Sequence, residues 1–108
     1  MTTLSTHVLD TAIGRPAEGV PVAFEREGIV LGSGLTDADG RVRNLSSVAP
    51  LSSGQYRLVF SVAAYFAATG RESFYSEIVV SFQITEAAQH YHVPLLLSPF
   101  GYSTYRGS

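Results

Sequence analysis

The sequence of 108 residues contains no cysteine and no lysine, so all seven of its basic residues are arginines. The absence of cysteine excludes disulfide bonds and thiolate chemistry. Because arginine is the only basic residue in use, its presence at one position does not by itself indicate paired hydrogen bonding to a carboxylate or phosphate. Only the position of an arginine in the fold can therefore indicate its role.

Charge is also scarce, because Asp, Glu, Lys and Arg together make up 15% of the chain, against about a quarter in typical soluble domains. The formal net charge is −2 and no block of basic residues occurs. Since phosphate recognition needs clustered cations, nucleic acid is not an expected partner. A surface with so few charges is what a subunit buried in an oligomer would show, so we expect association.

Long apolar runs are missing as well. No stretch of the sequence approaches the ~20 apolar residues of a membrane span, and the first residues lack the basic start and apolar core of a secretory signal. We therefore expect no membrane partner and a cytoplasmic location. A chain of 108 residues has room for one domain with a hydrophobic core, spanning residues 1–108.

Alternating apolar residues, separated by turn-forming residues, predict a series of short strands. The predicted strands cover 5–10, 20–26, 29–36, 41–45, 55–62 and 78–84, followed by two paired strands within 90–108. An alanine-rich stretch at 61–70 predicts one short helix, with Ser61 as its N-cap and Gly70 at its end. Seven or eight strands with one helix predict an all-β fold, a two-sheet β-sandwich.

Two of the three histidines stand together as His90-Tyr91-His92. Alternation along a strand directs His90 and His92 to the same side. With His7 from another strand, this spacing could hold a zinc ion. The alternative is that one histidine is exposed at the start of the strand while the other is hydrogen-bonded in a polar pocket.

Ser5, His7 and Asp10 resemble the residue types of a hydrolase triad. On one strand, however, Ser5 and His7 lie roughly 7 Å apart, which is beyond hydrogen-bond reach. A covalent serine mechanism between these two residues is therefore not expected.

A further set of polar groups suits the binding of a small planar molecule and the activation of water. A neutral histidine can take a proton from water, and an arginine or a tyrosine hydroxyl can stabilise the oxyanion that forms when a carbonyl is attacked. Spacing alone does not bring these groups together. The candidates are His7, Arg41, His92, Tyr105, Arg106 and the α-carboxylate of Ser108.

Three separated segments resemble the 5-hydroxyisourate hydrolases, the transthyretin-related enzymes of urate breakdown. The first is Leu4-Ser-Thr-His-Val-Leu-Asp10 with Gly14-Arg-Pro-Ala17, the second is Thr36-Asp-Ala-Asp-Gly-Arg41, and the third runs from Tyr91 to Ser108 and ends in Tyr105-Arg-Gly-Ser108. Intervening residues fit as well, so the resemblance spans essentially the whole chain.

The resemblance implies a transthyretin-like β-sandwich that assembles as a homotetramer, a dimer of dimers around a central channel. It also implies that the strands carrying His7, Arg41, His92 and Tyr105 belong to one sheet, which lines that channel. Residues distant in the sequence would then converge on one site.

The implied reaction is hydrolysis of 5-hydroxyisourate to 2-oxo-4-hydroxy-4-carboxy-5-ureidoimidazoline, a cyclic amide opening that needs no metal and no cofactor. The expected catalytic residues are His7, Arg41, His92 and Ser108, and the expected substrate-binding residues are His7, Arg41 and Tyr105. Two readings stay open beside it: a non-enzymatic module that binds an aromatic ligand, as transthyretin does, and a zinc hydrolase using His7, His90 and His92.

Overall fold

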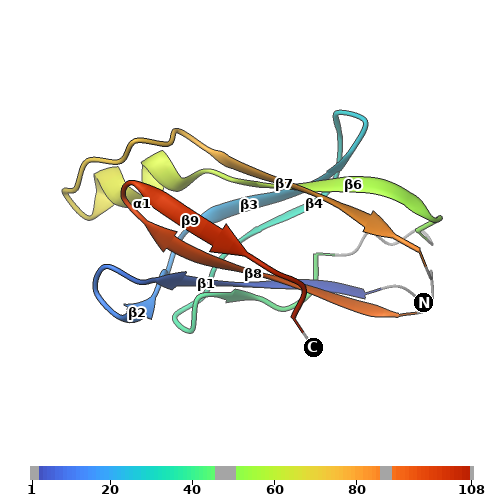
Figure 1. Cartoon of the computed structure of the whole chain (residues 1–108), viewed down its shortest axis with the longest axis horizontal. Coiled ribbons are helices and arrows are strands. Elements are labelled where there is room, and N and C mark those ends of the chain that lie inside the picture. The colour runs from blue at the N-terminus through green and yellow to red at the C-terminus, as the bar shows by residue number, and fades with distance from the viewer. Residues whose placement is uncertain (1–2, 46–50, 86–88, 108) are drawn as a thin grey trace.

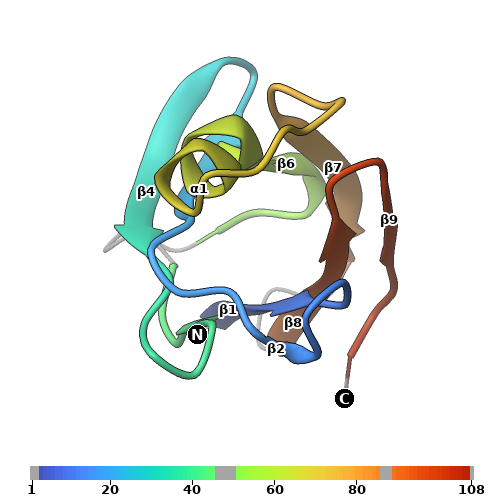
Figure 2. The same ribbon diagram turned by 90° about the vertical axis from the view of Figure 1, so that its left-hand side faces the viewer.

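The computed structural model describes residues 3–45, 51–85 and 89–107, which form two β-sheets packed face to face with one short helix at one end (Figure 1). The first sheet has the order β2-β1-β8-β9, with β5 also paired to β1, and the second has the order β4-β3-β6-β7. The end-on view shows the two layers enclosing the core (Figure 2). The predicted two-sheet β-sandwich is thus confirmed.

The bounds of the elements follow the predicted strands closely. The first sheet consists of β1 (Thr3–Asp10), β2 (Arg15–Pro16), β5 (Arg41–Val42), β8 (His90–Ser98) and β9 (Gly101–Thr104). The second consists of β3 (Pro21–Arg26), β4 (Ile29–Leu35), β6 (Gly54–Phe60) and β7 (Ile78–Ile84), and the helix α1 spans Val62–Ala68.

Four local expectations need correction. Arg15 and Pro16, which lie outside the predicted strands, form the two-residue strand β2, which brings the described strands to nine. The fourth predicted strand shrinks to Arg41–Val42, and β6 ends at Phe60 because the helix begins at Val62. Ser61 does occupy the N-cap position, but its side chain makes no capping hydrogen bond.

Gly70 ends the helix as predicted. Its φ of 72° lies in the left-handed region that glycine adopts without steric cost. The backbone N–H groups of Gly70 and Arg71 donate to the carbonyls of Ala67 and Phe66, which satisfies carbonyl groups of the last helical turn.

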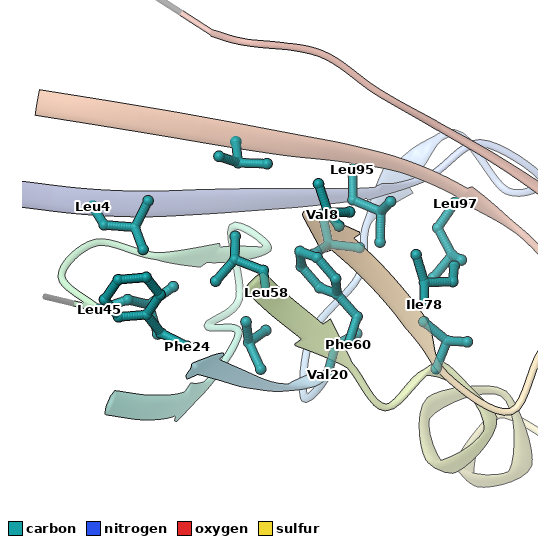
Figure 3. Packing of buried hydrophobic residues seen from close by; sticks show 14 of the residues in the cluster. Leu4, Val8, Val20, Phe24, Leu45, Leu58, Phe60, Ile78, Leu95 and Leu97 are labelled. Atoms are coloured by element: carbon teal, nitrogen blue, oxygen red, sulfur yellow. The ribbon is translucent and has the colours of Figure 1, made fainter. Parts of the chain in front are cut away.

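The core lies between the sheets because strand alternation turns every second side chain inward. The apolar side chains of β1 and β8 meet those of β3 and β6 there (Figure 3). Members of this core that are at most 1% exposed include Leu4, Val8, Phe24, Leu58, Phe60, Leu95 and Leu97. The alternate residues of β1 and β8 therefore face outward, away from the core.

The pairing of β1 with β8 is parallel and runs from Thr3↔His90 to Asp10↔Leu97. The first strand of the sandwich is thus joined along its whole length to a strand close to the end of the chain. No helix within the described ranges is long and apolar enough to cross a membrane.

Candidate active site

A tight turn at 37–40 sets the position of Arg41. The Asp37 carboxylate accepts hydrogen bonds from the backbone N–H groups of Asp39 and Arg41, at 2.9 and 3.0 Å. Gly40 has a φ of 77°, and a Cβ at this position would lie 2.4 Å from the carbonyl oxygen of Val8. Only glycine fits so close to β1 in that conformation, and the result is that Arg41 pairs directly with His7.

The sheet register brings the histidines to the same face. His7 is paired with Arg41 on one side and with Pro94 on the other, while Ser5 is paired with His92. Residues in register across a sheet project to one side. The expectation that His7, Arg41 and His92 stand on one sheet is therefore confirmed by the geometry, and their catalytic roles stay a prediction.

His92 is half-buried, and its ring is held by a neighbouring hydroxyl. The Oγ of Ser5 lies 2.7 Å from Nδ1 of His92, which leaves Nε2 for a different partner. Burial, followed by the positive charge of Arg41 and then by His7 and His90, lowers the pKa of His92 below its ordinary value of 6.5. A histidine with a lowered pKa stays neutral at pH 7, as a general base must.

A pocket of about 290 Å³ opens beside His92 on this face. Every residue that lines it is polar: Ser5, Thr6, Arg41, Arg43, His90 and His92. His7 is not part of this lining, although its charge acts on His92 and its strand position adjoins Arg41. The pocket therefore offers hydrogen-bonding groups and positive charge to a small polar molecule.

The charge of Arg41 acts on Asp37: after the hydrogen bond from the Arg41 backbone N–H, it helps to lower the pKa of that carboxyl. Among the described residues, the Arg41 side chain has neither an ion-pair nor a hydrogen-bond partner, whereas Arg43, Arg57 and Arg71 are each paired with a carboxylate. A guanidinium without such a partner beside a polar pocket is suited to bind a carbonyl oxygen or an anion.

Gly107 lies flat against the imidazole of His92. Its N–H donates to the carbonyl of His92 at 2.8 Å, and a Cβ at this position would lie 2.5 Å from Cδ2 of His92 and 3.2 Å from Cγ of Pro94. The glycine near the end of the chain thus forms one wall of the His92 site. Ser108, predicted as catalytic, lies outside the described residues.

Tyr105 does not line the polar pocket. It follows β9 rather than lying within it, is 57% exposed, and lines a separate, more apolar hollow of about 230 Å³ together with His92 and residues of β7. Arg106 lines the same hollow and stacks over the ring of Tyr91, with its guanidinium carbon 4.8 Å from the ring centroid. The substrate-binding role of Tyr105 stays a prediction.

The three histidines do not gather as metal ligands. Within residues 3–45, 51–85 and 89–107, no three His, Asp or Glu side chains form a group that could hold a metal ion. His90 is exposed and bonded to hydroxyls, while His92 is hydrogen-bonded in the pocket. This arrangement matches the alternative to the zinc reading.

Sequence reasoning missed the role of Ser5 in this site. On its own strand Ser5 lies too far from His7 for a hydrogen bond, and its partners are His90 and His92 on β8. The sequence does contain one signal for Ser5: strand alternation puts it on the same outward face as His7. The parallel register that aligns Ser5 with His92 cannot be read from the sequence.

A β-sandwich that carries two histidines and an arginine around a polar pocket on the outer face of one sheet belongs to the transthyretin-like class. The family model described as "HIUase/Transthyretin family" matches residues 4–107, so the chain belongs to this family. The chain is 45% identical to the 5-hydroxyisourate hydrolase of Salmonella dublin, over 97% of this chain and 80% of the relative.

Solved structures agree with this assignment. The structure of Klebsiella pneumoniae 5-hydroxyisourate hydrolase is 47% identical, with a TM-score of 0.90 over 100% of this chain and 94% of that one. Sea bream transthyretin in complex with thyroxine is 32% identical, with a TM-score of 0.89 over 96% of this chain and 93% of that one. The expected transthyretin-like fold is confirmed.

Proposed function

We propose that this protein hydrolyses 5-hydroxyisourate to 2-oxo-4-hydroxy-4-carboxy-5-ureidoimidazoline by attack of water on a cyclic amide carbonyl. Relatives that carry the name of this activity match the chain over nearly its whole length. The observation that carries the proposal is the polar pocket, in which Arg41, whose side chain has no ion pair or hydrogen bond with any residue that the structure describes, stands beside a half-buried histidine, His92.

In this mechanism His92 is the base. Its Nδ1 is engaged by Ser5, so Nε2 takes the proton from the attacking water. Arg41 donates hydrogen bonds to the carbonyl oxygen and stabilises the negative charge that develops on it. His7, the cross-strand neighbour of Arg41, binds the substrate and helps to position the water. No metal ion and no organic cofactor takes part.

Tyr105 and Ser108 complete the proposed set. Tyr105 is 57% exposed in one subunit, so its proposed role in orienting the substrate ring is assigned to the assembled protein. The role proposed for Ser108, which is to support the histidines through its hydroxyl, draws on the position of its neighbour Gly107 against His92.

The assembly we propose is a homotetramer, a dimer of dimers. Two observations support burial of further surface: charged residues make up only 15% of the chain, and several aromatic side chains stand in solvent. Phe74, Phe100 and Tyr102 are 74%, 69% and 44% exposed. Large apolar side chains exposed together are typical of protein interfaces. We further propose that the protein works in the cytoplasm.

A non-enzymatic ligand-binding role is the alternative, since sea bream transthyretin in complex with thyroxine has the same fold. An apolar aromatic ligand calls for an apolar wall. The pocket beside His92 is lined by six polar residues instead. The hydrolase is therefore the function that this geometry supports better.

The direct test follows the ultraviolet absorbance of freshly made 5-hydroxyisourate with and without the protein, because this compound also decays unaided. Arg41→Ala and His92→Ala should each lower turnover on the order of a hundredfold. Arg57→Ala, on the other sheet and paired with Glu25, is the matched control and should keep full activity. Decay at the unaided rate with the unaltered protein would refute the proposal, and retained activity in chelator separates it from a zinc mechanism.

A further inference from the structure

A chain of four side chains runs along the outer face of β1 and β8 from the pocket towards solvent. The Oγ of Ser5 lies 2.7 Å from Nδ1 of His92 and 3.0 Å from Nε2 of His90. Nδ1 of His90 in turn lies 2.5 Å from Oγ1 of Thr3. Ser5 is 9% exposed, whereas His90 is exposed. The buried hydroxyl therefore connects a histidine of the pocket with a histidine at the surface.

This contact pattern follows from the register of two parallel strands. Thr3 pairs with His90 and Ser5 pairs with His92, so hydroxyls and imidazoles alternate across the same face. The two histidines stand two residues apart, and the serine side chain is short enough to reach both rings. The geometry is thus built into regular strand backbone and needs no loop to hold it.

The Ser5 hydroxyl couples the protonation of the two rings because it has a single proton. It can donate to one ring nitrogen only, and it accepts a hydrogen bond from the other. If it donates to His90, then Nδ1 of His92 carries the proton and Nε2 is bare. If it donates to His92, the proton of that ring is on Nε2, and the ring cannot act as a base there.

We propose that Ser5 holds the resting His92 in the Nδ1-protonated form and, together with His90, forms a proton relay between His92 and solvent. Ser5 is then a positioning and relay residue, and His90 is the exchange point at the surface. The proposal rests on the proposed hydrolase function for its catalytic part, while its structural part concerns the resting protein alone.

The relay runs outward when water attacks. As the C–O bond forms, Nε2 of His92 takes a proton from the water. The Nδ1 proton of His92 moves to Oγ of Ser5, the Ser5 hydroxyl proton moves to Nε2 of His90, and His90 releases its Nδ1 proton to solvent. The serine hydroxyl is unchanged at the end, and both rings are neutral with their protons on Nε2.

The relay runs inward when the ring opens. The C–N bond breaks, and the departing nitrogen takes the proton from Nε2 of His92. In the same step His92 regains an Nδ1 proton from Ser5, Ser5 takes one from Nε2 of His90, and Nδ1 of His90 takes one from solvent, so that both rings stay neutral. The new carboxylic acid ionises near neutral pH, so one turnover consumes one water and releases one proton.

The charges around His92, Ser5 and His90 favour movement of the proton away from the pocket. Arg41 and Arg43 line the pocket from the β5 side, and His7 stands on β1. The positive charge of Arg41 opposes an imidazolium at His92 and contributes to its lowered pKa after burial. His90 lies at the surface, where water stabilises the charged ring.

The first test measures the resting protein without substrate. Nitrogen-15 NMR of the three histidines identifies which ring nitrogen of neutral His92 carries the proton. We expect Nδ1–H in the unaltered protein and in Ser5→Thr, which keeps the hydroxyl, and a shift to Nε2–H in Ser5→Ala. A resting His92 protonated on Nε2 in the unaltered protein overturns the proposal, whether or not 5-hydroxyisourate is the substrate.

The second test measures turnover of 5-hydroxyisourate at low buffer concentration. Ser5→Ala and His90→Gln should each lower kcat about tenfold with little change in KM, and added imidazole should restore kcat in His90→Gln by exchanging protons in place of the ring. Ser98→Ala is the matched control, because its hydroxyl lies on the same face of β8 but donates to the carbonyl of Gly101. Its kcat should be unchanged.

Two kinetic results would contradict the relay. Unaltered kcat in both Ser5→Ala and His90→Gln would show that proton exchange takes another route. Complete loss of activity in Ser5→Ala together with a covalent acyl group on Ser5 in the unaltered protein would make it a nucleophile. If the unaltered protein fails to hydrolyse 5-hydroxyisourate at all, the proposed function fails, and the NMR result still decides the tautomer.

Discussion

At the scale of single residues, the close contact of Gly107 with His92 explains why residue 107 is a glycine. Its α-carbon lies against the imidazole of His92, where a Cβ would come within 2.5 Å of Cδ2. Real Cβ atoms do not approach other atoms so closely, so a larger residue must displace the ring or the terminal segment. The position of the His92 ring therefore depends on the absence of a side chain at residue 107.

Gly107→Ala should therefore lower kcat about tenfold, because a small displacement of a catalytic group is costly. The fold should persist, since the clash is confined to the outer face of β8. Gly101→Ala is the matched control: a Cβ there meets only Oγ of Ser98, at 3.7 Å, which is an ordinary contact. Steady-state kinetics of both variants decides the matter, and equal activity would show that the His92 site tolerates the displacement.

The lowered pKa of His92 gives a second prediction at this scale. Burial and the charges of Arg41, His7 and His90 disfavour the protonated ring. Because the neutral ring is the base, kcat/KM should remain high at pH 6.5, the ordinary pKa of histidine, and fall only in more acid solution. A profile of kcat/KM against pH measures this directly, and an acid limb centred above pH 6.5 would contradict it.

Residue identities made much of the site predictable, but not its contacts. His7 and His92 could be selected because the chain has only three histidines, and Arg41, one of seven arginines, because the segment that it ends resembles the hydrolase family. Ser5 could not, because serine is common and its function depends on which residue lies across the strand. Tyr105 is predicted to bind substrate, and the structure places it in the hollow next to the polar pocket.

At the scale of elements, a buried ion pair joins the end of β1 to the segment after α1. Asp10 has a fully buried side chain that pairs with Arg71 at 2.5 Å and accepts a hydrogen bond from the hydroxyl of Tyr65 at 2.7 Å. Burial alone would raise the pKa of Asp10, but the bonds from Arg71 and Tyr65 outweigh it and lower the pKa below 3.8. The pair thus fixes the helix to the first sheet.

Arg71→Met should cost about 3 kcal/mol of unfolding free energy near neutral pH, because it leaves a buried carboxylate without its cation. Since the folded protein lowers the pKa of Asp10, this stabilisation is present above pH 3.8 and is lost at more acid pH. Urea denaturation at one fixed protein concentration measures the difference. Arg57→Met breaks a more exposed pair with Glu25 and should cost about 0–1 kcal/mol. An equal loss of unfolding free energy in the two variants would show that the buried Asp10–Arg71 pair stabilises the fold no more than the Arg57–Glu25 pair.

Element boundaries show where local sequence signals are sufficient. Alternation placed the long strands well, since β1, β3, β6 and β7 have one clearly apolar face. It failed for β2, whose two exposed residues become a strand only because β1 lies beside them. The parallel pairing of β1 with β8 is a tertiary feature, and no local pattern records it.

At the scale of the whole molecule, the exposed rings of Phe74 and Tyr102 meet the half-buried ring of Tyr75 where the segment after α1 adjoins the β8–β9 hairpin. The ring centroid of Tyr75 lies 5.1 Å from that of Phe74 and 5.3 Å from that of Tyr102. The N–H of Phe74 donates to the carbonyl of Pro99 at 2.8 Å, which ties the segment after α1 to the β8–β9 turn. This cluster presents an apolar surface to a second copy of the chain.

Phe74→Asp should therefore weaken the proposed tetramer and shift it towards smaller species at micromolar concentration, because a charge would have to be buried at the contact. Sedimentation velocity measures the distribution. Ile29→Asp is the matched control, since Ile29 is 65% exposed on the opposite edge strand β4. Dissociation of the tetramer by Ile29→Asp but not by Phe74→Asp would show that the interface lies at β4 instead.

The union of β1 with β8 also has a consequence for how the protein is made. Ser5 and His92 are 87 positions apart, so the serine leaves the ribosome long before its histidine is translated. During that interval β1 has no parallel neighbour, and pairings between such distant segments form slowly because a large loop must close first. A nascent chain interrupted before residue 90 would carry half of the active site on a strand that lacks its parallel neighbour, exposed to quality control and to aggregation.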